Sequence, residues 1–278
     1  MVKVVDVKQT PEASAALPPH LAALEAEAIH IFREAMADAQ RPVLLFSGGK
    51  DSTVLAHLAV AAFHPSPAPM PLLHIDSTFE FAETIKFRDD LAEAWGFDLI
   101  VRRNEEGAHQ QISPFTHGSA LYTEVMRTVP LKAALDELRS DVVFGGARRD
   151  EEKSRAKERI VSIRSVGHGW EPRAQRPELW RIFNTRLGPG HTARVFPLSH
   201  WTDADIWTYA WARRLPVAPP LLRRAPTDRR AGRRPAGGGR RALSLRGRRG
   251  ACHPPRPIPN RRLLARHRGH RVRGHDPA

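Results

Sequence analysis

The chain has a single cysteine, Cys252, among its 278 residues. One thiol cannot form an intramolecular disulfide, a zinc ribbon or a two-cysteine redox site, so these sites are excluded. Long apolar runs are absent too, and no segment approaches the roughly 20 residues of a membrane-spanning helix. The first ten residues contain no apolar signal-peptide core. We therefore expect a cytoplasmic protein without a membrane partner.

Acidic residues and lysine are almost absent from the last 60 residues, where the basic charge of the chain is concentrated. Residues 219–278 contain 18 arginines, no lysine and 2 aspartates, whereas the first 218 residues contain 26 basic and 28 acidic side chains. The body is thus nearly neutral. The net charge of +14 therefore does not indicate a nucleic-acid-binding domain.

This tail also differs from the body in composition. Arginine, proline, glycine and alanine supply 42 of its 60 residues, and Glu, Lys, Gln, Phe, Tyr, Trp and Met are missing. A segment with few large apolar residues and many charges of the same sign cannot bury enough apolar surface to offset the entropy lost on ordering, so we expect the tail to be disordered. Two interpretations stay open: a basic RNA-binding tail, or a GC-rich gene read out of frame, since these four residue types have GC-rich codons. We divide the chain into a folded domain, 1–218, and a tail, 219–278.

Alternating helices and apolar strands account for most of the folded domain. Apolar residues at helical spacing predict helices over residues 20–39, 53–62, 80–95 and 129–138. Short apolar runs bounded by turn residues predict buried parallel strands over residues 43–46, 71–76, 97–101 and 141–144. This alternation favours an α/β fold with a doubly wound parallel sheet, whose ligands bind at the carboxyl ends of the strands.

A glycine turn follows the first of these strands, with the sequence Ser47-Gly48-Gly49-Lys50-Asp51-Ser52. It is not a Walker A loop, because Leu44 occupies the first glycine position and Asp51 follows the lysine. The N–H groups of the turn and the dipole of the following helix favour an anion, and Lys50 adds a positive charge. The alternative is a tight turn with an exposed lysine, which the flanking strand and helix disfavour.

A second charged segment, residues 148–159, follows the last predicted strand and its Gly145-Gly146 end. It carries six cations and four anions. An isolated run of this kind is typical of a solvated helix, on which Glu151 and Arg155 form a favourable i, i+4 pair. The position after a strand and two glycines favours a role in ligand binding instead.

For that role we expect Arg148 and Arg149 to point into the same cleft as Lys50. Planar guanidinium groups there can hold sulfate and phosphate oxygens. Asp76 ends another predicted strand. There its carboxylate can accept a hydrogen bond from a ribose hydroxyl or bind Mg²⁺; the alternative is that it only caps the strand. His117 is either a substrate contact or a structural histidine.

Aromatic residues cluster near a helix start at Thr202 or Asp203. Trp201, Trp207 and Trp211 are predicted to belong to the core or to an interface. No histidine cluster, His-Glu-x-x-His motif or cysteine pair indicates a tightly bound transition metal, so we assign no metal-ligand residues.

The glycine turn matches the pyrophosphate loop (PP-loop) of ATP pyrophosphatases, which reads Ser-Gly-Gly-x-Asp-Ser. Other motifs are more selective. The chain resembles the small subunit of sulfate adenylyltransferase almost letter for letter over residues 74–78, 113–120, 144–159, 175–180 and 194–203. The resemblance runs from about Leu21 to about Val217.

The resemblance implies an adenine nucleotide alpha hydrolase-like fold and a nucleotidyltransferase of sulfate assimilation and cysteine biosynthesis. The implied reaction joins the adenylyl group of ATP to sulfate and releases pyrophosphate. Sulfate is already ionised, so catalysis rests on holding two anions in line rather than on a general base. In this hypothesis the catalytic residues are Lys50, Arg148 and Arg149. The nucleotide-binding residues are Ser47, Gly48, Gly49, Asp51, Ser52, Asp76, Gly145 and Gly146, and the candidate substrate contacts are His117, Lys153 and Arg155.

The resemblance also implies cofactors and partners. Mg²⁺ accompanies ATP, and a GTPase large subunit couples GTP hydrolysis to the uphill formation of adenylyl sulfate. This chain has no GTPase motif, so the partner is expected as a separate polypeptide in a heterodimer.

Three alternative functions stay open to comparison with this one. A phosphoadenylylsulfate reductase needs a nucleophilic cysteine, and Cys252 lies in the anomalous tail. A tRNA-modifying PP-loop enzyme could use the tail to contact RNA phosphates. The third is a catalytically impaired product, since positions after about Pro219 depart from the family, whose members continue with an ordered C-terminal region.

Overall fold

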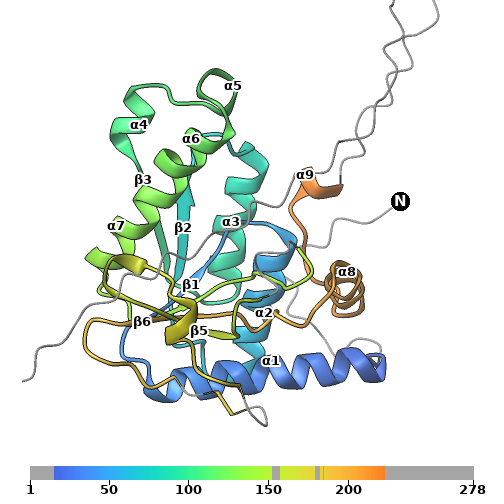
Figure 1. The fold of residues 1–278 in the computed structure, drawn as a ribbon. Helices are drawn as coiled ribbons and strands as arrows, with labels where there is room; N and C mark the ends of the chain where they lie inside the picture. Colours follow the sequence, from blue (N-terminus) through green and yellow to red (C-terminus); the bar gives the residue numbers. More distant parts are fainter. Residues whose placement is uncertain (1–15, 152–156, 179–181, 184, 223–278) are drawn as a thin grey trace, which may run out of the picture. The chain divides into compact units, whose positions relative to one another are not determined.

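The computed structural model describes residues 16–151, 157–178, 182–183 and 185–222 (Figure 1). Contacts divide the chain into Met1–Thr227 and Asp228–Ala278, and all described residues belong to the first unit. The predicted tail therefore lies outside the described residues, apart from its first four.

The described residues contain a single six-stranded sheet. Its strands are β1 (Pro42–Leu45), β2 (Leu72–Asp76), β3 (Leu99–Arg103), β4 (Val142–Phe144), β5 (Val161–Arg164) and β6 (Thr192–Val195). The strand order is β3-β2-β1-β4-β6-β5, and all neighbours are parallel except β5, which runs antiparallel to β6. The predicted doubly wound α/β sheet is confirmed, and two strands that were not predicted extend it: the parallel strand β6 and the antiparallel edge strand β5.

Helices connect these strands. They are α1 (Pro19–Asp38), α2 (Lys50–Phe63), α3 (Ala82–Ala94), α4 (Glu105–His109), α5 (Pro114–His117), α6 (Ser119–Thr123), α7 (Val129–Glu137), α8 (Asp203–Ala212) and α9 (Pro219–Leu222). A π-helical turn, η1 (Glu124–Thr128), joins α6 to α7, and two 3₁₀ turns are η3 (Val166–His168) and η4 (Pro172–Ala174). Among the described residues, no helix is long and apolar enough to cross a membrane.

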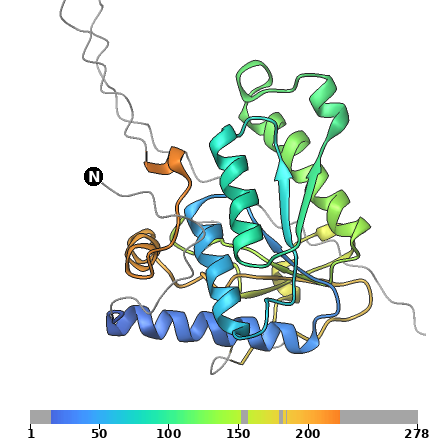
Figure 2. The ribbon, with the colours of Figure 1, turned by 180° about the vertical axis from the view of Figure 1, so that it is seen from behind.

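The two faces of the sheet are covered by different helices. In β1, Leu44 packs into the large core shared with α1 and α2, whereas its neighbour Val43 packs against Ala134 and Leu135 of α7. Figure 2 shows α2 and α3 in front of the strands, and Figure 1 shows α7 on the opposite side. Both faces of the central strands are therefore buried, which explains their continuous apolar sequences.

Several predicted boundaries shift for local reasons. Helix α2 begins at Lys50 rather than at residue 53, because Gly49 already has the extended conformation of an N-cap. Helix α3 begins at Ala82 rather than at residue 80, because the Glu80 side chain accepts hydrogen bonds from His74 and Ser77. Strand β3 ends at Arg103, which pairs with the last residue of β2.

The direction in which strands are added to the sheet reverses at β1. The chain passes from β1 through β2 to β3 on one side and returns to place β4 on the other side of β1. The segments that follow β1 and β4 thus leave the sheet side by side at the carboxyl ends of parallel strands. Open α/β sheets bind their ligands at this kind of switch point.

Candidate functional site

The glycine turn after β1 has the geometry of an anion-binding loop. Gly48 has a φ of +73°, and a Cβ built on it would lie 2.8 Å from Cγ2 of Thr84, so only glycine fits there. The Ser52 hydroxyl donates to the Gly49 carbonyl at 2.9 Å and lies 3.2 Å from the Ser47 hydroxyl. These bonds hold the loop against the first turn of α2, whose N–H groups have no partner within the helix.

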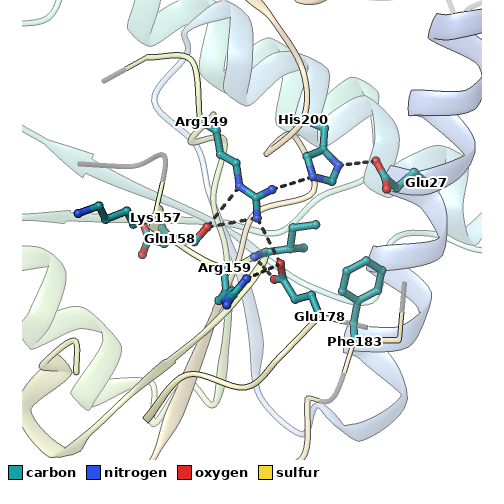
Figure 3. Close-up of a pocket in the computed structure, with 9 residues that line it drawn as sticks. Glu27, Arg149, Lys157, Glu158, Arg159, Glu178, Phe183 and His200 are labelled. Atoms are coloured by element: carbon teal, nitrogen blue, oxygen red, sulfur yellow. Dashed lines mark hydrogen bonds and ion pairs between the residues drawn. The ribbon is translucent and has the colours of Figure 1, made fainter. Parts of the chain in front are cut away.

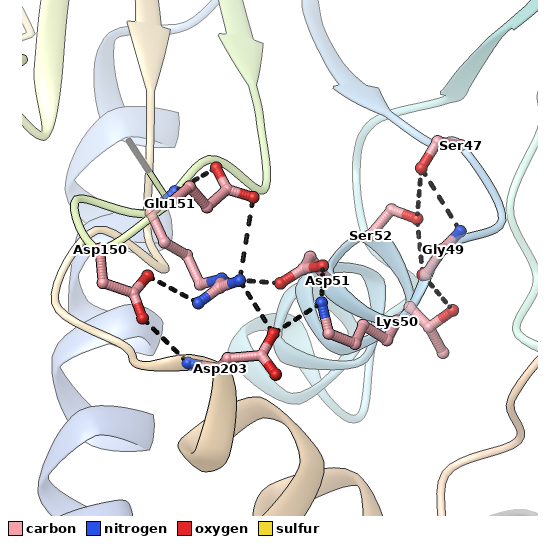
Figure 4. A network of polar contacts seen from close by, with 10 residues as sticks. Ser47, Gly49, Lys50, Asp51, Ser52, Asp150, Glu151 and Asp203 are labelled. Atoms are coloured by element: carbon pink, nitrogen blue, oxygen red, sulfur yellow. Dashed lines mark hydrogen bonds and ion pairs between the residues drawn. The ribbon is translucent and has the colours of Figure 1, made fainter. Parts of the chain in front are cut away.

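A network of charged side chains covers the end of this loop (Figure 4). Lys50 Nζ lies 2.8 Å from Oδ2 of Asp51 and 3.0 Å from Oδ1 of Asp203. Arg148, which follows β4, donates from Nε to Asp51 at 2.8 Å and from Nη1 to Asp150 at 2.7 Å. Its Nη2 donates to Asp203 at 3.2 Å. Lys50 and Arg148 therefore share the partners Asp51 and Asp203, and their predicted role in ligand binding stays a prediction.

This outer cluster (Lys50, Asp51, Arg148, Asp150 and Asp203) places a buried arginine among carboxylates. The Arg148 side chain is 4% exposed, and burying a guanidinium is tolerable only when acidic partners surround it. Burial lowers the pKa of Lys50, but its bonds to Asp51 and Asp203 outweigh this and raise the pKa above its usual value. The hydrogen bond from Lys50 lowers the pKa of Asp203. Lys50 thus stays charged near neutral pH.

Arg149 does not share these partners, contrary to the expectation that both arginines point toward Lys50. It donates from Nη1 to Nε2 of His200 at 2.8 Å and from Nη2 to Glu178 at 3.2 Å, and it also bonds the Glu158 carbonyl. Figure 3 shows these groups around a pocket of about 550 Å³. Residues 149–151 form a turn, and the side-chain partners of Arg149 come from segments that are distant in the sequence.

Two glycines after β4 bring the two loops together. A Cβ on Gly146 would lie 3.4 Å from the backbone carbon of Asp51, and one on Gly145 would lie 3.2 Å from the Phe196 ring. Small residues here permit the close approach of the β4 segment to α2. Gly145 and Gly146 contact protein atoms in this structure, and their role in nucleotide binding stays a prediction.

The remaining predicted residues lie apart from the outer cluster. Asp76 ends β2 and accepts the Thr78 N–H at 2.8 Å, as a strand cap does. His117 is exposed at the end of α5, where its Nδ1 lies 2.7 Å from the Thr116 hydroxyl. Lys153 and Arg155 lie outside the described residues, as does the proposed pairing of Glu151 with Arg155.

The three tryptophans divide between core and surface. Trp201 is buried at 1% exposure, Trp207 is 36% exposed and Trp211 is 79% exposed. The prediction of a core residue is confirmed for Trp201. Trp207 also donates a side-chain hydrogen bond to Asp203, one turn earlier on α8.

His74 positions the glycine loop and was not among the predicted site residues. Its Nδ1 lies 2.9 Å from the Phe46 carbonyl, directly before the loop, and its Nε2 lies 3.1 Å from Glu80. Burial raises the pKa of Glu80, but the bonds from His74 and Ser77 outweigh it, and the pKa lies below its usual value. A polar residue within a buried strand was the available signal, because buried polar groups need partners.

Asp203 was also missed, because nothing local in the sequence links it to Lys50. The first turn of α8 is set by a capping box between Thr202 and Asp205, which places Asp203 at the end facing the loops. The part of the chain that the structure describes holds no group of three or more His, Cys, Asp or Glu side chains arranged to bind a metal ion.

Comparisons with known proteins agree with this geometry. Residues 41–225 match the family model of the phosphoadenosine phosphosulfate reductase domain. Sulfate adenylyltransferase subunit 2 from Geotalea daltonii is 60% identical over 200 residues, which are 72% of this chain and 66% of that protein. The protein of the same name from Brucella ovis is 56% identical over 200 residues, which cover 72% of this chain and 67% of that protein.

A solved structure shares the fold. Phosphoadenylyl-sulfate reductase from Candida auris, in a phosphate complex, superposes with a TM-score of 0.51 at 17% sequence identity, and the match covers 75% of this chain and 93% of that chain. The resemblance inferred from the motifs is confirmed, although the chain spans only 66% of the length of the Geotalea daltonii relative. The chain belongs to the phosphoadenosine phosphosulfate reductase domain family, in which its relatives include sulfate adenylyltransferase subunit 2.

Proposed function

We propose that this chain is the ATP-binding subunit of a sulfate adenylyltransferase, which transfers the adenylyl group of ATP to sulfate and releases pyrophosphate. One observation carries the proposal: Lys50 and Arg148 converge beside the first turn of α2, in the segments that follow β1 and β4. The names of the relatives with 56–60% identity support the same reaction.

In this function the glycine loop holds the β- and γ-phosphates. The free N–H groups at the start of α2 and the helix dipole favour the polyphosphate, and Lys50 adds a charge that stays positive near neutral pH. Sulfate attacks the α-phosphorus as the bond to the β-phosphate oxygen breaks. The same groups then stabilise the negative charge that develops on the leaving pyrophosphate.

Arg148 and Arg149 have different roles in the proposal. Arg148 is buried and bonded to three aspartates, so it organises the outer cluster and reaches the polyphosphate beside Lys50. Arg149 lines the neighbouring pocket with Lys157 and Arg159, and these basic side chains guide sulfate toward the α-phosphate. Asp76 and His117 stay candidates for contacts with the ribose and the substrate.

Mg²⁺ enters with ATP as part of the substrate. Asp51 and Asp150 offer the carboxylate oxygens that Mg²⁺ prefers as ligands, although the described side chains form no ready-made cage. Bound Mg²⁺ neutralises phosphate charge. Lys50 and the glycine loop then orient the polyphosphate of ATP.

The relatives are named subunit 2, which implies at least one further subunit. We propose that this partner is a GTPase, because forming a phosphosulfate anhydride is strongly uphill and needs a second source of free energy. The chain and its partner are expected in the cytoplasm.

The reverse reaction gives the clearest test, because it is downhill and needs no GTP. Adenylyl sulfate and pyrophosphate are mixed with the purified chain, and ATP is followed by luminescence. We expect ATP formation by the wild type and a loss of about 100-fold or more in Lys50→Ala. Lys86→Ala is the matched control, since Lys86 is exposed and its partner among the described residues is Asp90.

The outcomes separate the alternatives. Equal rates in wild type and Lys50→Ala would contradict the assignment of the loop. Pyrophosphate binding without ATP formation identifies a nucleotide-binding chain that lacks catalytic parts found in the longer relatives.

A further inference from the structure

Asp203 lies where an anionic ligand is expected. Its Oδ1 is 3.0 Å from Lys50 Nζ and 3.2 Å from Arg148 Nη2. One negatively charged oxygen thus sits between the two cations that the proposed function assigns to the polyphosphate. A phosphate oxygen that binds both cations needs the same donors.

The other aspartate that links these cations differs in setting. Asp51 bonds both Lys50 and Arg148, but it lies on α2 beside the loop and its side chain is 23% exposed. The Asp203 side chain is 58% exposed and comes from α8, a separate element. Asp51 can therefore stay in place when a ligand binds, whereas Asp203 can rotate into solvent.

The backbone of Asp203 is held independently of its carboxylate. Its N–H donates to Oδ2 of Asp150 at 3.0 Å, and the neighbouring Thr202 caps the helix. The side chain also accepts a hydrogen bond from Trp207, on its own helix. Loss of the contacts to Lys50 and Arg148 would leave the start of α8 intact.

We propose that Asp203 is an internal competitor of the polyphosphate: its carboxylate occupies the oxyanion position between Lys50 and Arg148 in the empty site and is displaced when pyrophosphate or ATP binds. The proposal rests on the proposed function and adds a residue that sets ligand affinity. It also explains how two close cations remain stable before the ligand arrives, since the carboxylate screens their repulsion.

Calorimetric titration with inorganic pyrophosphate, at fixed ionic strength, tests this. Removing the competing charge in Asp203→Asn is expected to tighten pyrophosphate binding by about 3-fold. Asp203→Glu keeps the charge and is expected to show no gain. Asp90→Asn, which removes a surface charge paired with Lys86, controls for the change in net charge.

Whether pyrophosphate affinity rises or falls in Asp203→Asn distinguishes a competing role of Asp203 from a positioning role. If Asp203 instead positioned the two cations for the ligand, Asp203→Asn would bind pyrophosphate more weakly, which would overturn the proposal, as would unchanged binding. Thermal melting checks that the variant is folded, and Asp203→Ala gives a second variant without the carboxylate. If the wild type and all variants fail to bind pyrophosphate, the proposed function itself fails. Normal wild-type binding with no gain in either variant refutes the competitor role alone.

Discussion

Two polar clusters join the same pair of helices, α2 and α8, but one cluster is partly exposed to solvent and the other is mostly buried. The outer cluster lies at the first turns of both helices and contains the half-exposed Asp203. The inner cluster comprises Glu25, His57, Tyr209 and Arg213, with His57 only 8% exposed.

The inner cluster is closed by its own hydrogen bonds. The Tyr209 hydroxyl donates to Glu25 at 2.6 Å and lies 3.2 Å from Nδ1 of His57, while Arg213 pairs with both oxygens of Glu25. Burial and the bond to Glu25 raise the pKa of Tyr209, so the phenol stays protonated. This cluster fixes α8 against α1 and α2, which lets the outer cluster exchange partners with a ligand.

The largest effect is expected at Arg148. Replacing it with alanine leaves Asp51, Asp150 and Asp203 without their shared cation, and breaking a buried ion pair costs about 3 kcal/mol or more. Arg149→Ala is the matched comparison, since its side chain is 29% exposed and should cost clearly less. Denaturant unfolding measures both. Equal losses would remove the distinction between these neighbours.

The inner cluster is expected to make the free energy of unfolding depend on pH. Burial lowers the pKa of His57 to about 4, against 6.5 when unfolded, so only the unfolded chain gains a proton between these values. Stability is therefore complete above about pH 7 and falls as the pH drops through 6.5 toward 4, by about 3 kcal/mol in total. His57→Leu should lose this slope. The same slope in both proteins would show that other groups cause it.

A smaller effect is expected at Tyr209. Tyr209→Phe removes the hydroxyl that bonds Glu25 and His57, which should reduce the free energy of unfolding by about 1.5 kcal/mol. Pyrophosphate affinity should not change, because the ring still packs against Trp201. A weaker pyrophosphate affinity in this variant would mean that the two clusters are coupled.

Local sequence predicted the parts of the fold that depend on local physics. The apolar run before Ser47 and the helix after Gly49 follow from strand and helix periodicity, and their order placed Lys50 at a helix N-terminus. Strand β6 was missed, because Thr192–Val195 is short and contains Arg194. Strand β5 was also missed, because Val161–Arg164 is short and lies next to a charged segment. Its position on the sheet edge depends on pairing with β6, which no local pattern encodes.

The candidate site shows the same division. Arg148 was found because its charged segment follows a predicted strand and two glycines. The divergence of Arg149, the partner of His74 and the contact between Asp203 and Lys50 all depend on where distant segments meet. Residues far apart in the sequence supply these contacts, so spacing alone could not place them.

The most direct test of the central claim is calorimetric titration of MgATP into the wild type and Lys50→Ala. We expect one ATP bound per chain for the wild type and a loss of at least about 10-fold in affinity for the variant. Equal affinity, with both proteins folded, would show that the nucleotide binds elsewhere and would contradict the assignment of the outer cluster.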